Sequence, residues 1–593
     1  MPETILVAVA WPYSNADIHV GNIAGAYLPA DIFARYHRLR GNRVLMVSGT
    51  DAHGTPITVR ADAEGRTPDD VYRRFHRRFL ELFVRAGLSY DLFTTTHNPN
   101  HFRVSQDFFL RLKENGFLET RTEDQWYSPA EGRFLPDRYI EGECYICHYP
   151  NARGDQCENC GNLLEATLLI RPRARTGGGA LELRPTEHFY LNLSRLAPEL
   201  DRYLAAGKEH WRPNVLNPSR HSVLHEGLPS RAITRDLDWG IPVPVPGWEG
   251  KRIYVWFEAV IGYFSASIEW ARHRSAPEAW KDWWYDPEAK SYYFIGKDNI
   301  IFHAIIWPAE LLGVVRLYDD DPSRRLNLPY DVPANEFLNL EGQKISGSRN
   351  WAVWGLDFLE RYDPDPLRFY LTSVMPEARD SEWDWADFVR RNNDELVATW
   401  GNLSHRVASF AHRHWDGRVP EPGELAPQDQ ELLANIEDGF ESVGRRIGEV
   451  NLRAALGDAL GRARLVNGYL DRAPWFSAIR TDRPAAARTV YTALQAIDHL
   501  KLIFAPFLPF TSERLHRALG YGEPLFGEPR IVHVEDGQDG HEALIYDSSQ
   551  ASGRWAPGRL PPGQSLQAPQ PLFRKLDDAV VEAERARLGS APG

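Results

Sequence analysis

The sequence predicts a multidomain α/β fold in which a parallel sheet, split by a cysteine-containing insertion, is followed by a helical bundle. Residues 5–11 and 43–48 are apolar and strand-like, and residues 20–40 carry apolar side chains at helical spacing, which together make a strand–helix–strand unit. All cysteines fall within 144–160. From about 385 to 519, apolar residues recur at helical spacing with few glycines, as in helical bundles.

Length and charge narrow the class of protein. The 593 residues suffice for about three to five domains. The net charge of −13 argues against a protein that coats nucleic acid or anionic membranes non-specifically. Four clustered cysteines, an amino terminus without a basic region and the lack of any stretch of about 20 apolar residues indicate a soluble cytoplasmic protein with no membrane segment.

A second α/β stretch follows the insertion. RIYVWF (252–257) and SYYFIG (291–296) are predicted strands, and IIFHAIIWPAELLG (300–313) is a predicted helix. In a parallel sheet, ligands bind beyond the carboxyl ends of the strands. PYSNADIHVGN (12–22) and GTDAHGTP (49–56) leave two of those ends and are therefore expected to border a ligand site.

The cysteines form two C-x-x-C pairs, Cys144 with Cys147 and Cys157 with Cys160. Two such pairs with a short spacer can surround one tetrahedral metal, as in a structural zinc site. Because protein ligands fill all four positions, this zinc is expected to be structural and not catalytic. Four free buried cysteines, or a redox pair, are the alternative interpretation.

His19, Gly21 and Asn22 lie where the first predicted helix begins. The side chains of His19 and Asn22 share one face of that helix, near its positive end, where phosphate groups are stabilised. Gly21 would let a base or ribose approach the backbone. Taken alone, a histidine here is more often a helix cap or a surface residue.

Two polar segments supply cations to the same crevice. Lys344 and Gly347 belong to the loop EGQKISGSRN, which can close on a polyphosphate and stabilise the charge of a leaving pyrophosphate. Gly296, Lys297 and Asp298 end another predicted strand. Taken alone, the loop around Lys344 is more often an ordinary solvated turn, and a cation beside a carboxylate at a strand end is common.

Aromatic residues near the strand ends are expected to converge on a small apolar pocket. Asp51 could receive an ammonium group at the edge of this pocket. Packing in the core is the alternative for each aromatic residue taken singly. The candidates are Tyr13, Trp256, Tyr263, Phe302, His303 and Trp307.

Taken in order, these blocks resemble the methionyl-tRNA synthetase family of class I aminoacyl-tRNA synthetases over nearly the whole chain. HVGN corresponds to the class I signature H-I-G-H, and KISGS to K-M-S-K-S. The four-cysteine cluster, YVWFEAVIGY and FIGKDNIIFH complete the likeness. The resemblance implies a Rossmann-like catalytic domain split by a zinc-knuckle insertion, followed by an α-helical anticodon-binding bundle.

The resemblance also implies roles for particular residues. Catalytic groups would be His19, Asn22 and Lys344. Methionine would be bound by Trp11, Tyr13, Asp51, Trp256, Ala259, Tyr263, Phe302, His303 and Trp307. ATP would be bound by His19, Gly21, Asn22, Arg235, Gly296, Lys297, Asp298, Lys344 and Gly347. The anticodon would be read by Asn402, Arg406 and Trp475, and zinc would be bound by Cys144, Cys147, Cys157 and Cys160.

The expected division of the chain follows the family. A Rossmann-like catalytic domain would have its first half at 1–115 and its second half at 239–325, with the connective insertion at 116–238. A segment that carries KISGS and contacts the tRNA stem (326–385), a helical anticodon-binding domain (386–535) and a carboxyl-terminal tail (536–593) would follow.

Four positions depart from the family pattern. Trp11 stands where some members have leucine, Val260 where others have proline, and Asn22 where the signature ends in histidine. The largest departure is Gly347, because it replaces the second lysine of K-M-S-K-S and removes a cation expected near the phosphates. The hypothesis is that Lys344 and Lys297, with Arg349, supply enough positive charge.

The implied reaction has two steps. The carboxylate of L-methionine attacks the α-phosphate of ATP, which carries Mg²⁺, and the methionyl group then passes to the terminal ribose of initiator or elongator tRNA(Met). A monomer is expected. Leucine, isoleucine or valine enzymes of the same class carry a larger insertion, and a cysteine-specific relative would place zinc in the amino-acid pocket. A paralogue that only binds tRNA is the non-enzymatic alternative, supported by Gly347 alone.

Overall fold

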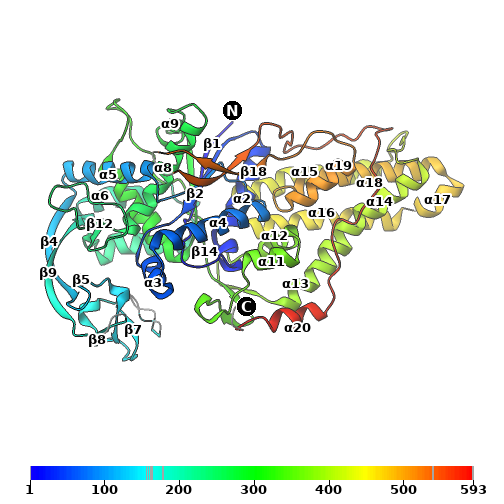
Figure 1. Ribbon diagram of the computed structural model, residues 1–593. Helices are drawn as coiled ribbons and strands as arrows, with labels where there is room; N and C mark the ends of the chain where they lie inside the picture. Colours follow the sequence, from blue (N-terminus) through cyan, green and yellow to red (C-terminus); the bar gives the residue numbers. More distant parts are fainter. Residues whose placement is uncertain are drawn as a thin grey trace.

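A sheet of seven strands lies at the centre of the molecule and draws strands from both ends of the chain (Figure 1). The computed structural model describes residues 2–154, 157, 159–160, 164–175, 179–473, 475–536 and 540–589. In spatial order the strands are β14 (Ala334–Asn335), β13 (Lys290–Gly296), β1 (Thr4–Val9), β2 (Arg43–Thr50), β3 (Leu92–Thr95), β19 (His541–Asp547) and β18 (Glu528–Val534). The pairings from β14 to β3 are all parallel, so the predicted parallel sheet and its strands at 5–11, 43–48 and 291–296 are confirmed.

Helices cover both faces of this sheet, and β1 shows this residue by residue. Ile5, Val7 and Val9 point into one core, and the intervening Leu6 and Ala8 point into the other. Since successive side chains of a strand face opposite sides, a strand buried on both faces must be apolar throughout. On one face lie α1 (Val20–Asn22), the π-helical turn η1 (Ile23–Tyr27), α2 (Leu28–Leu39), α3 (Thr55–Glu64) and α4 (Pro68–Ala86). On the other lie α5 (Pro99–Glu114), α8 (Val255–His273), α9 (Lys281–Trp284), η7 (Phe302–Ile306) and α10 (Trp307–Val314).

One predicted strand is wrong. In the segment 252–257, only Arg252–Ile253 forms a strand, β12, and helix α8 begins at Val255. The segment is rich in aromatic and β-branched residues, which favour strands. The structure instead buries α8 on nearly all sides, and a helix without an exposed face shows no amphipathic period to reveal it.

The insertion is built on a long antiparallel pair of strands, β4 (Leu118–Ser128) and β9 (Glu182–Leu191), at the end of the molecule opposite the helical bundle (Figure 1). The sheet around this pair consists of β10 (Arg231–Ala232), β9 (Glu182–Leu191), β4 (Leu118–Ser128) and β5 (Arg133–Phe134). A smaller sheet, β7 (Ala152–Arg153), β6 (Ile140–Glu143) and β8 (Ile170–Ala174), adjoins the cysteines. Short 3-10 turns η2 (Asp137–Tyr139), η3 (Ala166–Leu168) and η4 (Leu193–Leu196) precede α6 (Ala197–Ala205), α7 (Pro213–His221) and the π-helical turn η5 (Ser222–Glu226). The pair β11 (Thr234–Arg235) and β12 returns the chain to α8.

Beyond β14, a short three-stranded sheet carries the segment KISGS. Its members are β16 (Gln343–Lys344), β15 (Leu338–Leu340) and β17 (Ser381–Trp383). The chain then forms the 3-10 turn η8 (Gly347–Arg349), α11 (Gly355–Arg361) and α12 (Pro364–Ser373). This sheet lies next to the carboxyl ends of β13 and β14, where ligands are expected.

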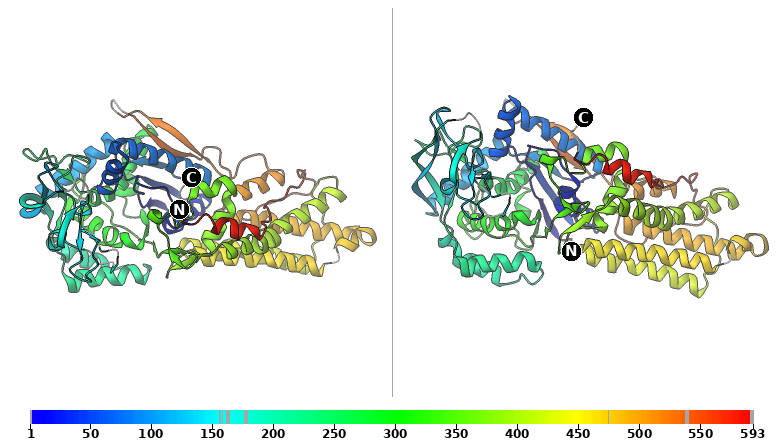
Figure 2. Two further views of the ribbon diagram at one scale, coloured as in Figure 1. Left: turned by 60° about the horizontal axis from the view of Figure 1, so that its bottom comes forward. Right: turned by 90° about the horizontal axis from the view of Figure 1, so that it is seen from below.

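The predicted helical bundle is confirmed. Its long helices lie side by side and extend away from the central sheet (Figure 2). The helical segments of the bundle, long and short, are α13 (Trp385–Arg391), η9 (Asn392–Gly401), α14 (Asn402–His414), α15 (Pro427–Gly448), α16 (Leu452–Arg472), α17 (Trp475–Thr481), α18 (Arg483–Phe504) and α19 (Pro509–Ala518). Among the described residues, no helix has the length and hydropathy needed to cross a membrane.

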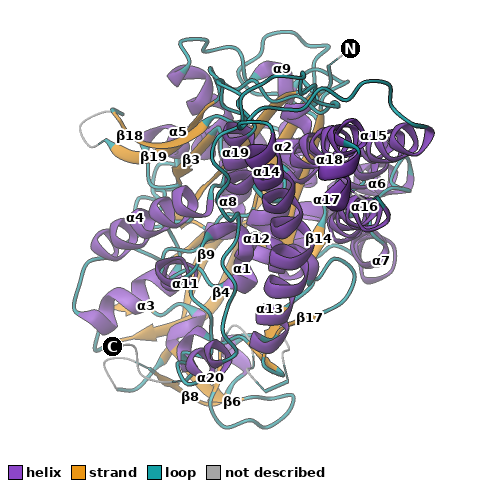
Figure 3. Cartoon of the chain, turned by 90° about the vertical axis from the view of Figure 1, so that its right-hand side faces the viewer, coloured by secondary structure: helices purple, strands orange, loops and turns teal. Residues whose placement is uncertain are grey.

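The predicted tail at 536–593 begins with a strand of the central sheet. Strand β19 pairs with β18 along its whole length and meets β3 at Leu544 and Phe93. The side chain of His541 lies 2.9 Å from the hydroxyl of Thr94 and 3.0 Å from the carboxylate of Glu269. The chain then runs back along the bundle to helix α20 (Ala579–Arg585), which lies beside α13 (Figure 3).

Candidate active site

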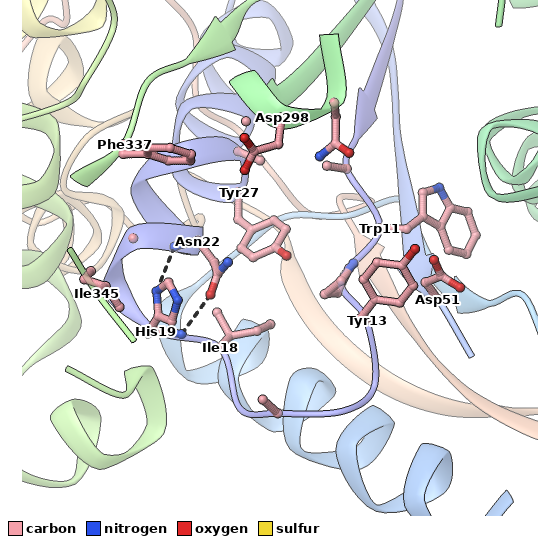
Figure 4. Close-up of a pocket in the computed structure, with 18 of the residues that line it drawn as sticks. Trp11, Tyr13, Ile18, His19, Asn22, Tyr27, Asp51, Asp298, Phe337 and Ile345 are labelled. Atoms are coloured by element: carbon pink, nitrogen blue, oxygen red, sulfur yellow. Dashed lines mark hydrogen bonds between the residues drawn. The ribbon is translucent and has the colours of Figure 1, made fainter. Parts of the chain in front are cut away.

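A cavity of about 520 Å³ opens beyond the carboxyl ends of β1, β2 and β13 (Figure 4). The structure brings most of the predicted methionine and ATP residues together in its walls. They are Trp11, Tyr13, His19, Gly21, Asn22, Asp51, Trp256, Ala259, Tyr263, Gly296, Asp298, Phe302, His303, Lys344 and Gly347. Arg235, Lys297 and Trp307 are predicted site residues that do not line the cavity.

His19 caps the first helix, and its hydrogen bonds define its tautomer. Its ring Nδ1 accepts a hydrogen bond from the backbone N–H of Asn22 (3.3 Å). The backbone N–H of His19 in turn donates to Oδ1 of Asn22 (3.1 Å). Burial lowers the pKa of His19 to about 4, so the ring is neutral near pH 7. Because Nδ1 is an acceptor, the proton of the neutral ring is on Nε2, which is left as a donor.

Gly21 is explained by its neighbours. A Cβ at this position would lie 3.0 Å from the His19 ring and 3.1 Å from the side chain of Ile345. Both contacts are tighter than ordinary van der Waals packing. Gly21 therefore makes room for His19 and Ile345, a reason that differs from the predicted approach of a base or ribose.

Asp51 and Tyr13 form the other end of the cavity. The two residues are neighbours in an extension of the parallel pairing, with the N–H of Asp51 donating to the carbonyl of Pro12 (2.9 Å). Asp51 is buried, and desolvation raises its pKa well above the ordinary range, with a further contribution from the nearby charge of Glu258. The indole N–H of Trp256 donates to the hydroxyl of Tyr13, and the Trp256 ring meets Phe302 edge-on at 4.6 Å.

His303 is held in one orientation at the floor of this pocket. Its Nδ1 lies 2.9 Å from the carbonyl of Asn299, and its Nε2 lies 2.8 Å from the hydroxyl of Tyr263. A carbonyl only accepts, so Nδ1 carries the proton and Nε2 accepts from Tyr263. Burial lowers the pKa of His303 to about 4, which keeps the ring neutral.

The unusual Trp11 is accommodated by two glycines. A Cβ on Gly49 would lie only 2.0 Å from Cζ3 of the indole ring, and a Cβ on Gly262 would lie 2.6 Å from Cζ2 of the same ring. The ring of Tyr263 meets Trp11 edge-on at 6.2 Å. A large residue at position 11 thus depends on the lack of side chains at positions 49 and 262.

Beneath Asp51 lies a buried carboxylate that the sequence analysis missed. Glu258 is fully buried on α8, and its two oxygens lie 2.6 Å from Nδ1 of His53 and 2.6 Å from Nε2 of His101. These histidines lower the pKa of Glu258 to about 2 against the opposing effect of burial. The available signal was an acid within the apolar run YVWFEAVIGY, because a charge in a buried helix requires partners.

Lys297 and Lys344 both lie near the ring of Phe337 but differ in their ionic partners. The Nζ of Lys297 is 2.8 Å from Glu336 and 2.8 Å from Asp380, and it lies 4.0 Å from the Phe337 ring. Lys344 lines the cavity, is exposed and lies 5.1 Å from the same ring. Lys344 is therefore the available ammonium group of the two, and Lys297 is committed to two carboxylates.

Arg235 and Trp307 also have other partners. Arg235 lies over the ring of Tyr254 (4.0 Å) and donates to the carbonyls of Ala232 and Thr234. Trp307 is fully buried, and its indole N–H donates to the hydroxyl of Tyr293 (2.9 Å). Trp307 thus supports the core behind the cavity.

The cavity also has wall residues that no sequence motif indicated. They include Asn15, Tyr27, Asn299, Glu336, Phe337 and Trp354.

The loop that carries Lys344 is closed by hydrogen bonds near its end. Ser346 and Trp351 exchange two backbone hydrogen bonds of 2.9 Å, and the indole of Trp354 donates to Oδ1 of Asn350 (2.8 Å). A Cβ on Gly347 would lie 3.2 Å from the Trp354 ring. Arg349, named as a further cation, is exposed and does not line the cavity.

The four cysteines converge as one group in the insertion. Their sulfur atoms all lie within 4.8 Å of one another, and those of Cys147 and Cys157 are 3.5 Å apart. The backbone N–H groups of Ile146 and Cys147 lie 3.4 and 3.5 Å from Sγ of Cys144. A tetrahedral zinc with bonds of about 2.3 Å requires sulfur atoms about 3.8 Å apart, so the group fits a metal ion.

Two of the predicted anticodon residues, Arg406 and Trp475, lie close together in the bundle. Arg406 bonds Oδ1 of Asn467 (3.4 Å) and lies 5.9 Å from the Trp475 ring, and Asn402 is exposed at the start of α14. Trp475 is only 5% exposed, whereas its neighbour Phe476 is 66% exposed. Phe476, which no sequence motif indicated, is therefore the accessible ring at this position.

Comparison with protein families assigns most of the chain. The family described as tRNA synthetases class I (M) matches residues 5–408. The family described as the anticodon binding domain of methionyl tRNA ligase matches residues 419–548.

Two relatives agree with the family assignment, and one solved structure shares the fold. A methionine–tRNA ligase of Thermomicrobium roseum is 58% identical over 593 residues, covering 99% of each chain. A methionine–tRNA ligase of Thermobifida fusca is 46% identical over 607 residues, again covering 99% of each chain. A solved Mycobacterium tuberculosis methionyl-tRNA synthetase in complex with methionyl-adenylate has a TM-score of 0.76 at 24% identity, covering 97% of this chain and 100% of that chain.

Proposed function

The chain belongs to the methionine-specific family of class I tRNA synthetases, and on this premise we propose that the cavity is where methionine and ATP react. The enzyme activates L-methionine with ATP to methionyl-adenylate and pyrophosphate and transfers methionine to the 3′-terminal ribose of tRNA(Met). One observation carries the assignment of the site: Asp51, His19 and Lys344, from three separate segments, line the same cavity.

The end of the cavity around Asp51 is proposed to bind methionine. An ammonium group next to Asp51 offsets both the burial and the repulsion by Glu258, so the carboxylate is ionised when the amino acid is bound. The neutral, fixed ring of His303 and the aromatic walls can receive an uncharged thioether side chain. The walls are Trp11, Tyr13, Trp256, Ala259, Tyr263 and Phe302.

The end around His19 is proposed to bind ATP. The Nε2–H of His19 and the side chain of Asn22 can bond phosphate oxygens at the start of α1, and the carboxylate of Asp298 can bond ribose hydroxyls. Lys344 would stabilise the charge that develops on pyrophosphate, and Mg²⁺ would arrive bound to ATP. Lys297 would take part only if its ion pairs with Glu336 and Asp380 opened.

Exchange of labelled pyrophosphate into ATP tests the reaction directly. We expect exchange that depends on L-methionine and not on leucine, isoleucine, valine or cysteine. Exchange with another of these amino acids would assign a different specificity. A protein that binds tRNA but supports no exchange with any amino acid would be the binding-only paralogue.

The four cysteines are proposed to hold one structural Zn²⁺. The convergence of their sulfur atoms in the insertion supports this assignment, and a site with four protein ligands leaves no position for substrate. We expect about one zinc per chain by elemental analysis. Cys144→Ser should lose the metal and unfold the knuckle, whereas retention of metal would contradict the ligand set.

The helical bundle is proposed to read the anticodon of initiator and elongator tRNA(Met). Asn402 and Arg406 offer polar groups to base edges, and the adjacent aromatic rings offer stacking.

We further propose a cytoplasmic monomer, since described residues of a single chain supply all walls of the cavity and the thiol ligands require a reducing compartment. Light scattering after gel filtration tests the oligomeric state.

A further inference from the structure

The carboxyl-terminal helix α20 contacts the loop that carries Lys344. Here the Lys344 loop means residues 341–350, from the turn between β15 and β16 to Asn350, the residue after η8. The guanidinium of Arg585 lies 2.9 Å from the carboxylate of Glu341 and 3.3 Å from that of Asp384. Glu341 is the first residue of the loop, so this ion pair holds the loop at its start.

A second contact holds the other end of the loop. The backbone N–H of Gly589 donates to the carbonyl of Asn350 (3.0 Å). Asn350 also accepts from the indole of Trp354, whose ring lies 6.0 Å from that of His19. The residues after α20 are thereby connected to the wall of the cavity through Asn350 and Trp354.

Glu341 is a sharply defined point of attachment. Its backbone has a positive φ of 47°, and its N–H donates to the carbonyl of Trp383 (2.9 Å). Its carboxylate accepts hydrogen bonds from the backbone N–H of Trp385 (2.8 Å) and from the guanidinium of Arg585. A residue held on both its backbone and its side chain can transmit a fixed position to Lys344, three residues further on.

Helix α20 is itself firmly held. Glu584 is 4% exposed, and its carboxylate receives two bonds from Arg361 (2.7 and 2.8 Å) and one from Tyr362 (2.9 Å). Upstream, the amide side chain of Asn393 makes two hydrogen bonds of 2.9 Å to the backbone of Leu576. The segment therefore spans from the helical bundle and α11 to the Lys344 loop as a braced element.

We propose that α20 clamps the Lys344 loop, with Arg585 acting through Glu341 as a positioning residue for adenylate formation. The clamp holds both ends of the loop, so Ile345 stays beside His19 (Figure 4) and Lys344 stays in the wall of the cavity. Catalysis by a positioned cation is sensitive to small displacements, because its benefit depends on being in place before charge develops. The inference rests on the proposed role of Lys344.

The experiment compares Arg585→Ala with Lys575→Ala in methionine-dependent pyrophosphate exchange. Lys575 is exposed in the same carboxyl-terminal segment and makes no ion pair among the residues that the structure describes, so its loss controls for charge. We expect Arg585→Ala to lower kcat about five- to twentyfold with the KM for methionine within about twofold. Arg585→Lys should recover part of the loss, and Lys575→Ala should match the wild type.

Two further variants separate positioning from general stability. Glu341→Gln should reproduce the loss, and the double variant with Arg585→Ala should be no worse than either single variant, because both break one contact. Arg585→Ala should add nothing in a Lys344→Ala background. A lower melting temperature with unchanged kcat, or an equal effect without Lys344, would overturn the clamp. Wild-type protein without methionine-dependent exchange would instead overturn the proposed function.

Discussion

The carboxylate of Glu258 lies 2.6 Å from Nδ1 of His53. His53 follows Asp51 by two residues in the chain. Glu258 is thereby held as a buried anion close to the carboxylate proposed to bind the amino group of methionine. The two acids repel each other, and this repulsion adds to burial in raising the pKa of Asp51. The imidazoles of His53 and His101 hydrogen-bond the carboxylate of Glu258, whereas Asp51 accepts a longer hydrogen bond from the backbone N–H of His53 (3.4 Å).

Methionine binding should therefore release a proton and weaken as the pH falls. Because the pKa of free Asp51 is raised, its carboxyl stays protonated at a pH where an ordinary aspartate is ionised, and the ammonium group must displace that proton. Glu258→Gln should lower the pKa of Asp51 and move the onset of weakening to lower pH. Methionine affinity, measured by tryptophan fluorescence across the pH range, checks both; affinity independent of pH would contradict the mechanism.

Trp11 and Gly49 should behave as a coupled pair. Gly49→Ala places a methyl group 2.0 Å from Cζ3 of Trp11, a severe clash, so we expect kcat/KM for methionine to fall about a hundredfold. In a Trp11→Leu background, the smaller side chain leaves space, and the same substitution should cost less than about tenfold. Gly457→Ala on α16 is the control, because Gly457 does not line the cavity and a Cβ at this position meets no atom within 4 Å. Additive effects of the two substitutions would refute the coupling.

Lys344→Ala should slow methionine activation without weakening methionine binding. Removal of one preorganised charge at a developing anion lowers kcat by about 10²-fold to 10³-fold. Exposed Lys113 on α5 is a matched control and should be replaceable by alanine without effect. The measurement is pyrophosphate exchange with varied ATP. An unchanged kcat would assign the phosphate charge to another residue, with Lys297 the first to examine.

Phe476 should bind tRNA by stacking on a base, and this stacking should contribute more to tRNA binding than its neighbour Trp475 does. Phe476 is exposed and Trp475 is packed against Phe410 at 4.5 Å, so only Phe476 can receive a base without rearrangement. Phe476→Ala should raise the KM for tRNA(Met) by about fivefold to a hundredfold and leave pyrophosphate exchange unchanged. Exposed Leu465 on α16 provides a control through Leu465→Ala. Equal KM values for wild type and Phe476→Ala would exclude the stacking role.

Asp31 should make stability sensitive to acid. This fully buried carboxylate lies 2.9 Å from Arg35 and 2.6 Å from Arg368, and these contacts lower its pKa to about 2. A lowered pKa stabilises the fold above the unfolded value of 3.8, and the contribution, about 2 kcal/mol, is lost as the pH falls toward 2. Asp31→Asn should lower the free energy of unfolding near pH 7 and flatten its dependence at acid pH. Urea unfolding at several pH values measures both.

Local patterns predicted much of the fold because burial leaves a direct record in the sequence. The continuous apolar runs gave the parallel strands, and the C-x-x-C spacing identified a group of sulfur atoms that the fold does bring together. Helix α8 was missed because complete burial erases helical periodicity.

The other differences between the predicted and the observed site depend on contacts between distant parts of the chain. Lys297 is withdrawn from the cavity by Asp380, 83 residues away, and Trp307 by a hydroxyl on a neighbouring strand. Glu258 and its histidines come from three separate elements. No local pattern can distinguish a lysine that is free to meet a phosphate from one already paired.

Strand β19 has a consequence for the order in which the chain folds. It pairs with β3, which lies about 450 residues earlier, so during synthesis the edge of β3 remains open until most of the polypeptide has left the ribosome. An exposed strand edge is a template for unwanted pairing with other chains. Nascent protein truncated before His541 should therefore aggregate more readily than full-length protein, even though every wall of the cavity has already been made.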